Sequence, residues 1–194
     1  MKILVTGANG YLGQGVVKKL LDNGHCVIAT DFATNHIDDR AKKLSANIFE
    51  IEEPYNYFDK PDIVLHMAWK DGFVHYSESH ILDLPKHFEF LKKFVSTEIK
   101  KIVVMGSMHE IGFWEGKISE DTPCNPLSYY GISKNALRRM VEILVKDTNI
   151  KYQWLRGFYI VGNTPYGSSI FSKIVKAENE RTKRISFYIW TKSI

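Results

Sequence analysis

The sequence predicts an α/β protein in which helices cover both faces of a parallel sheet. Short, continuously apolar segments rich in β-branched residues alternate along the chain with amphipathic segments of helical spacing. Of the 194 residues, 44% are hydrophobic and 25% are charged, a balance that fits one globular core of ordinary size. A glycine-rich turn joins the first apolar segment to the first amphipathic one, as expected where such a sheet binds a ligand.

Six apolar segments are expected to form the strands, because each is short and carries little charge, as in strands buried on both faces. Crossovers between them are expected to be right-handed, and a ligand is expected outside the carboxyl ends of the strands. The expected strands are Lys2–Thr6, Cys26–Thr30, Ala46–Ile51, Asp62–Ala68, Lys101–Ser107 and a stretch within Tyr152–Val161.

The helices are predicted from apolar residues that recur every three or four positions. Residues four apart from Leu12 to Leu20 mark the first helix. Pro85 is expected to begin or to kink a long helix over residues 78–96, because proline lacks the backbone donor of a helix interior. The other helices are expected as a short one near Asp38–Leu44, a strong one over Ser128–Lys146 and a last one over Ser168–Glu180.

The turn after the first strand has glycines at every third position, and each suits a different task. Gly7 permits a tight turn, Gly10 lets the backbone approach a pyrophosphate, and Gly13 lets the helix lie close to the sheet. The helix N-terminus offers free N–H groups to phosphate. A plain glycine-rich turn is the alternative, but the strand–turn–helix context favours a dinucleotide site on a Rossmann-type, doubly wound sheet of three layers. The cofactor-binding positions expected here are Gly7, Asn9, Gly10, Tyr11, Leu12 and Gly13.

An acidic residue, Asp31, ends the second strand, 18 residues after Gly13. A carboxylate at this place can accept hydrogen bonds from the adenosine ribose and would repel a 2′-phosphate. NAD is therefore expected as the cofactor in preference to NADP, and the first arginine that follows is Arg40. An ordinary aspartate at a strand end is the alternative.

Tyr130 and Lys134 lie one turn apart on the predicted fourth helix, on the line that continues to Leu137 and Val141, so both are expected to face inward. The ammonium group is expected to lower the pKa of the phenol toward neutrality, which would let Tyr130 give or take a proton. Ser107 closes the fifth strand, where its hydroxyl could polarise a substrate carbonyl. The Tyr–Lys spacing alone is common in helices, and Ser107 at the sheet edge is what makes it significant.

Together these segments resemble a known family. TGANGYLG at residues 6–13, Asp31, Ser107 and YGISK at residues 130–134 are similar, in this order, to the short-chain dehydrogenase/reductase superfamily. The resemblance is to its extended branch, the NAD-dependent epimerases and dehydratases that act largely on nucleotide sugars. It implies that Tyr130 is the acid/base, that Lys134 tunes it and binds the nicotinamide ribose, and that Ser107 orients the substrate.

The same resemblance extends to other segments. His66–Trp69 is similar to the family's H-x-A-A segment, which lines the cofactor site, and this adds Ala68 to the expected cofactor-binding residues. Ser107-Met108-His109 stands where dehydratases have Thr-Asp-Glu, so epimerase or keto-reductase chemistry is expected rather than dehydration. The resemblance also implies a small-molecule substrate, possibly a nucleotide sugar, and pairing of two copies through the helix that carries Tyr130.

Two regions are expected. Residues 1–167 would form an NAD(P)-binding Rossmann domain, and residues 168–194 the remnant of a substrate-binding region, because extended members continue well past the sixth strand. The chain is therefore interpreted as truncated at its carboxyl end. An NAD-dependent epimerase or oxidoreductase is the favoured function. A non-catalytic dinucleotide-binding module, or an inactive fragment of such an enzyme, is the alternative.

Charge and cysteine content exclude other classes. The net charge of +4 resides in residues 173–194, which hold six basic and two acidic side chains, so no nucleic-acid face is predicted. No apolar run reaches the ~20 residues that span a bilayer, and no leader is recognised, so a cytoplasmic protein without a membrane partner is expected. Cys26 and Cys124 are too few for a disulfide framework or a thiolate metal site.

The remaining polar candidates are expected to have no chemical role. His75, His80 and His87 lack a metal-ligand spacing and are expected to be solvated surface residues, and no metal site is predicted. His109 and Glu110 are expected to be loop residues without a catalytic function.

Overall fold

The computed structural model describes residues 1–160 and 176–180. The chain divides into two units, residues 1–158 and residues 159–194. In the second unit residues 176–179 are helical. Residues 168–175 of the expected helix Ser168–Glu180 lie outside the described residues, as does most of the expected region 168–194.

The elements of the first unit are β1 (Lys2–Thr6), α1 (Tyr11–Asp22), β2 (Cys26–Asp31), β3 (Lys42–Ser45), α2 (Pro54–Tyr57), β4 (Ile63–His66), α3 (Ser79–Val95), β5 (Lys101–Ser107), the 3-10 turn η1 (Met108–Glu110), α4 (Tyr129–Val145) and β6 (Lys151–Gly157).

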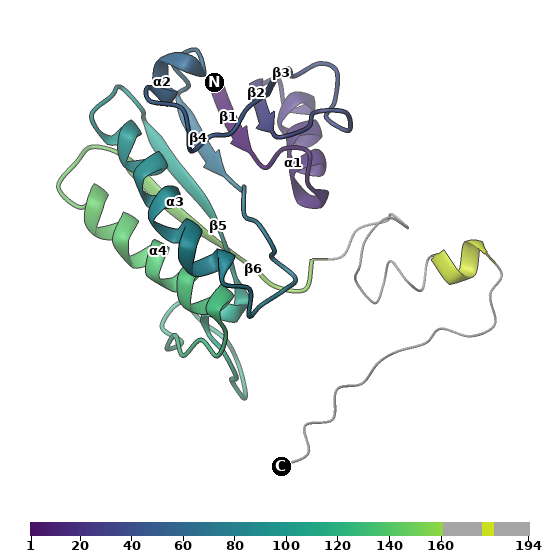
Figure 1. The fold of residues 1–194 in the computed structure, drawn as a ribbon, viewed down its shortest axis with the longest axis vertical. Coiled ribbons are helices and arrows are strands. Elements are labelled where there is room, and N and C mark those ends of the chain that lie inside the picture. The colour runs from purple at the N-terminus through teal and green to yellow at the C-terminus, as the bar shows by residue number, and fades with distance from the viewer. Residues whose placement is uncertain (161–175, 181–194) are drawn as a thin grey trace. The chain divides into compact units, whose positions relative to one another are not determined.

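The six strands form a single sheet in the order β3-β2-β1-β4-β5-β6, and every neighbouring pair is parallel (Figure 1). β1 is central and pairs with β2 on one side and β4 on the other, so the strand order reverses beside it. Open parallel sheets bind ligands at this switch point. The predicted doubly wound α/β fold is confirmed.

The sheet is covered on both faces, which gives three layers. Successive side chains of β1 point to opposite faces, as the period of a strand requires. Leu4 belongs to the larger core cluster, which it shares with buried residues of α3 and α4 such as Phe90 and Leu137. Val5 belongs to the second cluster, which includes Val17 of α1. Figure 1 shows α1 on one side of the sheet and α3 with α4 on the other.

The third strand lies earlier in the sequence than predicted. It comprises Lys42–Ser45 and pairs with β2, whereas Ala46–Ile51, predicted as the strand, is loop and turn. The short helix expected near Asp38–Leu44 is therefore also wrong. The loop still buries Ile48, which is 7% exposed within the larger core cluster, so an apolar residue there serves packing without being in a strand. A short, lysine-rich edge strand suits a sheet margin that must not pair with another chain.

Pro85 lies inside α3, so the expectation that it begins the helix is wrong. The helix starts at Ser79 and runs to Val95. Its buried face includes Phe90 and Phe94, which anchor it in the core. Burial of these large apolar side chains offsets the hydrogen bond that proline cannot donate.

Candidate functional site

The glycine turn between β1 and α1 is built by close contacts of the backbone. Gly7 has a φ of +68°, a left-handed conformation that glycine adopts without strain. A Cβ atom there would lie 2.7 Å from the backbone nitrogen of Ala68. A Cβ atom at Gly13 would overlap the carbonyl oxygen of Gly7, so α1 begins directly against the turn. Gly10 is the N-cap of α1, and the first N–H groups of the helix have no partner within it.

Asp31 holds this turn in place at the end of β2. One of its carboxylate oxygens, Oδ2, accepts a hydrogen bond from the backbone N–H of Asn9 at 3.0 Å. The other, Oδ1, accepts one from the N–H of Phe32 at 2.8 Å. Asp31 therefore connects β2 to the turn after β1, a structural role in addition to the ligand binding predicted for it.

A cavity of about 330 Å³ lies at the carboxyl ends of β1, β2 and β4, at the point where the strand order reverses. Its size is at the lower end of ligand pockets. Of the expected cofactor-binding residues it is lined by Gly7, Gly10, Asp31 and Ala68, and not by Asn9, Tyr11, Leu12, Gly13 or Lys134. Its other walls are Thr30, Phe32, Ala46, Ile48, Phe49, Met67, Trp69, Lys70, Asp83 and His87.

The cavity suits the adenosine end of a dinucleotide. A carboxylate at the end of β2 offers acceptors to ribose hydroxyls, and the amino end of α1 offers donors and a partial positive charge to phosphate. Apolar side chains from the loop after β3, among them Ile48 and Phe49, line another wall, against which a base could lie. The residues present therefore fit the group that the sequence predicts.

The expected catalytic residues adjoin the cavity through Trp69, a residue of its wall. Lys134 is 2% exposed, and its Nζ donates a hydrogen bond to the carbonyl of Met105 in β5 at 2.7 Å. The same Nζ lies 3.9 Å from the centroid of the Trp69 ring. The ring of Tyr130 lies 6.2 Å from that of Trp69, edge to face. Ser107, at the end of β5, is 7% exposed.

The pKa of Tyr130 moves in the direction opposite to the one expected. Burial raises the pKa of the phenol, a hydrogen bond with the Ser107 side chain acts against this, and the negative charge of Glu110 raises the pKa further. The expected lowering by Lys134 is wrong because the ammonium group is directed at the Met105 carbonyl. Tyr130 is therefore a protonated phenol at neutral pH. Burial also lowers the pKa of Lys134 to about 7, against the opposing charge of Glu110.

Residues 3–192 match the model of the NAD dependent epimerase/dehydratase family. The chain belongs to this family.

Individual relatives agree with the family assignment. The chain is 41% identical over 186 residues to dTDP-6-deoxy-L-talose 4-dehydrogenase (NAD(+)) from Aggregatibacter actinomycetemcomitans, in a match that covers 93% of this chain and 69% of that protein. A UDP-glucose 4-epimerase structure has a TM-score of 0.78 at 21% identity, covering 95% of this chain and 62% of that one. UDP-glucuronic acid 4-epimerase from Bacillus cereus, in complex with NAD, has a TM-score of 0.64 at 25% identity, with 80% and 56% covered. The chain thus spans about 56–69% of these relatives' length.

Two histidines of this family member are buried, contrary to expectation. His80 and His87 are 1% and 2% exposed, whereas His75 is half-buried, so the prediction of solvated surface histidines is wrong. Both lie on the core-facing side of α3. Nδ1 of His80 accepts a hydrogen bond from Nε1 of Trp69 at 3.0 Å, and Nδ1 of His87 lies 2.8 Å from Nε2 of His66.

The His66–His87 pair continues a hydrogen-bonded chain that begins at Thr6. The hydroxyl oxygen of Thr6 accepts hydrogen bonds from the N–H groups of Met67 and Ala68, each at 3.2 Å. Its own proton is then directed to Nδ1 of His66 at 2.9 Å, so Nε2 of His66 donates to Nδ1 of His87. Both imidazoles are neutral. Burial lowers the pKa of His66 to about 3 and that of His87 well below its ordinary value.

These neutral imidazoles predict that the fold loses stability in mild acid. The unfolded chain binds a proton at each histidine near pH 6.5, whereas the folded chain leaves His66 uncharged down to about pH 3. Between these values the unfolded state binds more protons, so the free energy of unfolding falls as the pH falls. One such site contributes a slope of about 1.4 kcal/mol per pH unit.

Urea unfolding between pH 7 and pH 4.5 measures this slope. We expect His66→Gln to reduce the slope of unfolding free energy against pH by the contribution of about one proton, and to lower the stability at pH 7. His36→Gln is the control, because His36 is exposed and its replacement is expected to leave the slope unchanged. Equal slopes for the wild type and His66→Gln would contradict the prediction.

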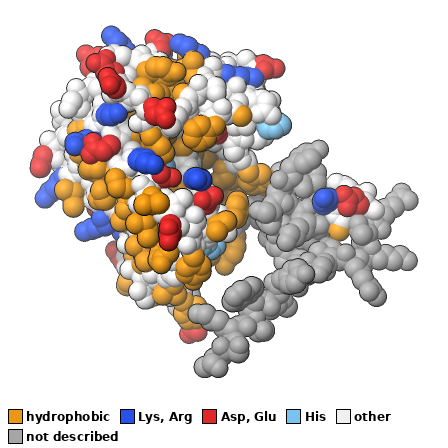
Figure 2. All heavy atoms as spheres, viewed as in Figure 1, with side chains coloured by type: hydrophobic (Ala, Val, Ile, Leu, Met, Phe, Trp, Pro, Cys, Tyr) orange, Lys and Arg blue, Asp and Glu red, His pale blue; other side chains and the backbone are white. Residues whose placement is uncertain are grey.

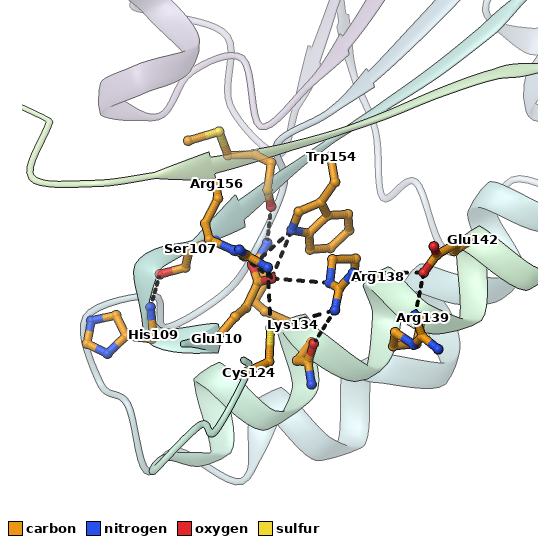
Figure 3. Close-up of polar contacts among 12 residues, drawn as sticks. Ser107, His109, Glu110, Cys124, Lys134, Arg138, Arg139, Glu142, Trp154 and Arg156 are labelled. Atoms are coloured by element: carbon orange, nitrogen blue, oxygen red, sulfur yellow. Dashed lines mark hydrogen bonds and ion pairs between the residues drawn. The ribbon is translucent and has the colours of Figure 1, made fainter. Parts of the chain in front are cut away.

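Glu110 is the residue that sequence reasoning most clearly missed, since it is completely buried. Its Oε1 accepts hydrogen bonds from the N–H of Ser107 at 2.7 Å and from Nε1 of Trp154 at 3.0 Å. Its Oε2 lies 3.2 Å from Nη2 of Arg156 and 3.7 Å from Nε of Arg138 (Figure 3). The carboxylate thereby joins η1, α4 and β6 beside Ser107.

Cys124 lies beside the same guanidinium groups. Its Sγ accepts hydrogen bonds from Nη2 of Arg156 at 3.4 Å and from Nη2 of Arg138 at 3.6 Å.

Residues 1–160 and 176–180 contain no group of three acidic, histidine or cysteine side chains that could hold a metal ion. In the same ranges no helix has the length and apolar character needed to cross a membrane.

Proposed function

We propose that the chain is the cofactor-binding part of an NAD-dependent enzyme that interconverts a hydroxyl and a keto group on a nucleotide-linked sugar. The observation that carries this proposal is the Trp69 contact, which brings Lys134 and Tyr130 to the wall of the cavity formed by the glycine turn and Asp31. A cofactor site and a proton donor are thus adjacent at the carboxyl edge of the sheet. Residues 1–167 would form this NAD-binding domain, and residues 168–194 part of the region that closes over the substrate.

The chain's own residues offer a place for each part of NAD. The amino end of α1, with Gly10 as its N-cap, would take the pyrophosphate, and Asp31 would accept hydrogen bonds from the adenosine ribose. Ala68 lines the cavity beside Gly7. When bound, NAD supplies an acceptor or donor of hydride. The relatives with NAD in their names or structures, the talose dehydrogenase and the Bacillus cereus epimerase, support this choice.

The protein supplies the proton. Tyr130 is protonated at neutral pH, so it can donate to the oxygen of a substrate carbonyl as that carbonyl is reduced, and in the reverse direction its phenolate would take the hydroxyl proton. Ser107, at the end of β5, would hold the substrate oxygen against the phenol. The buried Lys134 would supply positive charge beneath the nicotinamide ribose.

The similarity to the talose dehydrogenase favours a dehydrogenase or keto-reductase acting at a sugar carbon over an epimerase. Epimerase chemistry is the second candidate, since a solved relative at 25% identity is a 4-epimerase.

The homodimer stays a prediction. It is supported by Ile81, Leu82, Ile132 and Ile143, which are 49–71% exposed on α3 and α4. Figure 2 shows hydrophobic side chains among charged ones on this face.

Calorimetric titration with NAD⁺ and with NADP⁺ tests the cofactor assignment. We expect NAD⁺ to bind at least about tenfold more tightly, because the Asp31 carboxylate would repel a 2′-phosphate. Asp31→Asn keeps an acceptor for the Asn9 N–H and removes the charge. It is therefore expected to reduce the difference in affinity between NAD⁺ and NADP⁺. Asp39→Ala is the control, since its side chain is fully exposed. Equal binding of both nucleotides by the wild type would refute the role of Asp31, and binding of neither would refute the cofactor site in this chain.

A further inference from the structure

Lys134 has an unusual environment for a buried ammonium group. Its Nζ has one hydrogen-bond acceptor, the Met105 carbonyl at 2.7 Å, and no carboxylate of the described residues lies within 4 Å of it. The other close group is the indole of Trp69, whose centroid is 3.9 Å away. An aromatic face attracts a cation electrostatically, and the attraction is strongest where water is excluded. The Trp69 ring therefore stabilises the buried ammonium group in the way that a carboxylate partner usually does.

The indole itself is held from two directions. Its Nε1 donates a hydrogen bond to Nδ1 of His80 at 3.0 Å, and Nε2 of His80 lies 3.0 Å from the carbonyl of Val74, so the tautomer of His80 is fixed. The indole also stacks on His87, with ring centroids 4.3 Å apart and an interplanar angle of 9°. A ring with a bonded edge and a stacked face has little freedom to turn. Its orientation toward Lys134 is thus built into α3 and the loop after β4.

Trp69 is also part of the cavity wall, and its ring meets Tyr130 edge to face at 6.2 Å. It is the shared neighbour of the cavity, the lysine and the tyrosine. We propose that Trp69 is a positioning residue that keeps the Lys134 ammonium charged and fixed at the edge of the cofactor cavity by a cation–π contact. This inference rests on the proposed function only for its consequence in catalysis, because the contact itself exists in the chain without cofactor.

The charge on Lys134 is finely balanced. Burial lowers its pKa to about 7, so a modest change in surroundings alters the charged fraction at neutral pH. The titratable groups that face it are Glu110 of η1, which favours the charge, and His66 and His87, which are neutral, together with Tyr130 on its own helix. The neutral His66, His87 and Tyr130 carry no negative charge, so they do not stabilise the ammonium group as the aromatic face does. Loss of the indole is therefore expected to shift the protonation equilibrium about tenfold toward the neutral amine.

The test follows the Lys134 side chain by NMR in protein labelled with ¹³C and ¹⁵N at lysine, with Lys134→Arg to assign its signal. In the wild type the Cε protons of Lys134 are expected to resonate upfield of ordinary lysine, because they lie near the indole face. Trp69→Leu is expected to abolish that upfield displacement and to lower the pKa of Lys134. Trp69→Phe keeps an aromatic face and is expected to retain most of both effects. Trp114→Leu, at a half-exposed tryptophan, is the matched control.

The result that overturns the proposal is a Lys134 titration in Trp69→Leu that matches Trp114→Leu, or undisplaced Cε protons in the wild type. The second readout needs no Trp69 variant, so a failure of Trp69→Leu to fold leaves the proposal falsifiable. Neither measurement requires NAD or turnover. A chain that binds no NAD but shows the displaced protons would refute the proposed function and leave the Trp69–Lys134 contact standing.

Discussion

Replacing Glu110 by alanine is expected to lower the free energy of unfolding by about 3–5 kcal/mol, the cost of breaking a buried ion pair by removing one partner. The carboxylate is completely buried, whereas the side chains of Arg156 and Arg138 are 18% and 22% exposed. Without it the Arg156 guanidinium loses its carboxylate partner, and Arg138 keeps the half-exposed Glu142. The N–H groups of Ser107 and Trp154 would lose their acceptor as well.

A matched control is available on the same arginine. Glu142 also pairs with Arg138, at 3.8 Å, but it is 49% exposed, and Glu142→Ala is expected to cost at most about 1 kcal/mol. Glu110→Gln keeps one acceptor oxygen, replaces the other by an NH2 donor and removes the charge, so its loss of stability is expected to lie between those of Glu110→Ala and Glu142→Ala. Urea unfolding at pH 7 followed by circular dichroism measures all three. A loss for Glu110→Ala no larger than that for Glu142→Ala would show that the network does not stabilise the fold.

The parts of the molecule that the sequence predicted are those encoded locally. The turn from Gly7 to Gly13 is recognisable because a strand, the glycines and a helix follow one another directly, and Asp31 follows from the strand that pairs with β1. The Glu110 network could not be found in this way. Two of its donors, Trp154 and Arg156, are 44 and 46 residues distant along the chain, and only the pairing of β5 with β6 brings them together.

The buried histidines did leave a signal. His80, His87 and Phe94 are spaced by seven residues, so they share one face of α3 with the apolar residues that enter the core. The shared spacing indicates burial of both histidines, whereas the polar character of each one alone indicates exposure. The direction of the pKa shift of Tyr130, in contrast, left no such signal in the sequence. Helical spacing brings Lys134 to the same face as Tyr130, but it does not decide whether the ammonium group turns toward the phenol or toward the Met105 carbonyl.

Tyr130→Phe is expected to reduce turnover by about 10³-fold, a barrier increase of about 4 kcal/mol, while the affinity for NAD⁺ changes by less than about twofold. The phenol is the group that would give the proton to the substrate oxygen, and phenylalanine keeps the ring contacts with Trp69 and His75 without the hydroxyl. The removed atom would lie in the proposed proton path and not in the expected cofactor contacts. Turnover is measured with NAD⁺ and dTDP-6-deoxy-L-talose as the probe, and affinity by calorimetry on the same preparation.

The neighbouring tyrosine provides the control for this experiment. Tyr129 precedes Tyr130 on α4 and is 42% exposed, so Tyr129→Phe removes an identical hydroxyl from the outer side of the same helix turn and is expected to leave turnover unchanged. Equal loss of turnover and of NAD⁺ affinity in Tyr130→Phe would assign the residue a structural role. Unchanged turnover would remove it from the proton path. A loss of turnover alone, absent from Tyr129→Phe, would support Tyr130 as the acid/base, since both variants remove one phenolic hydroxyl from neighbouring positions of α4.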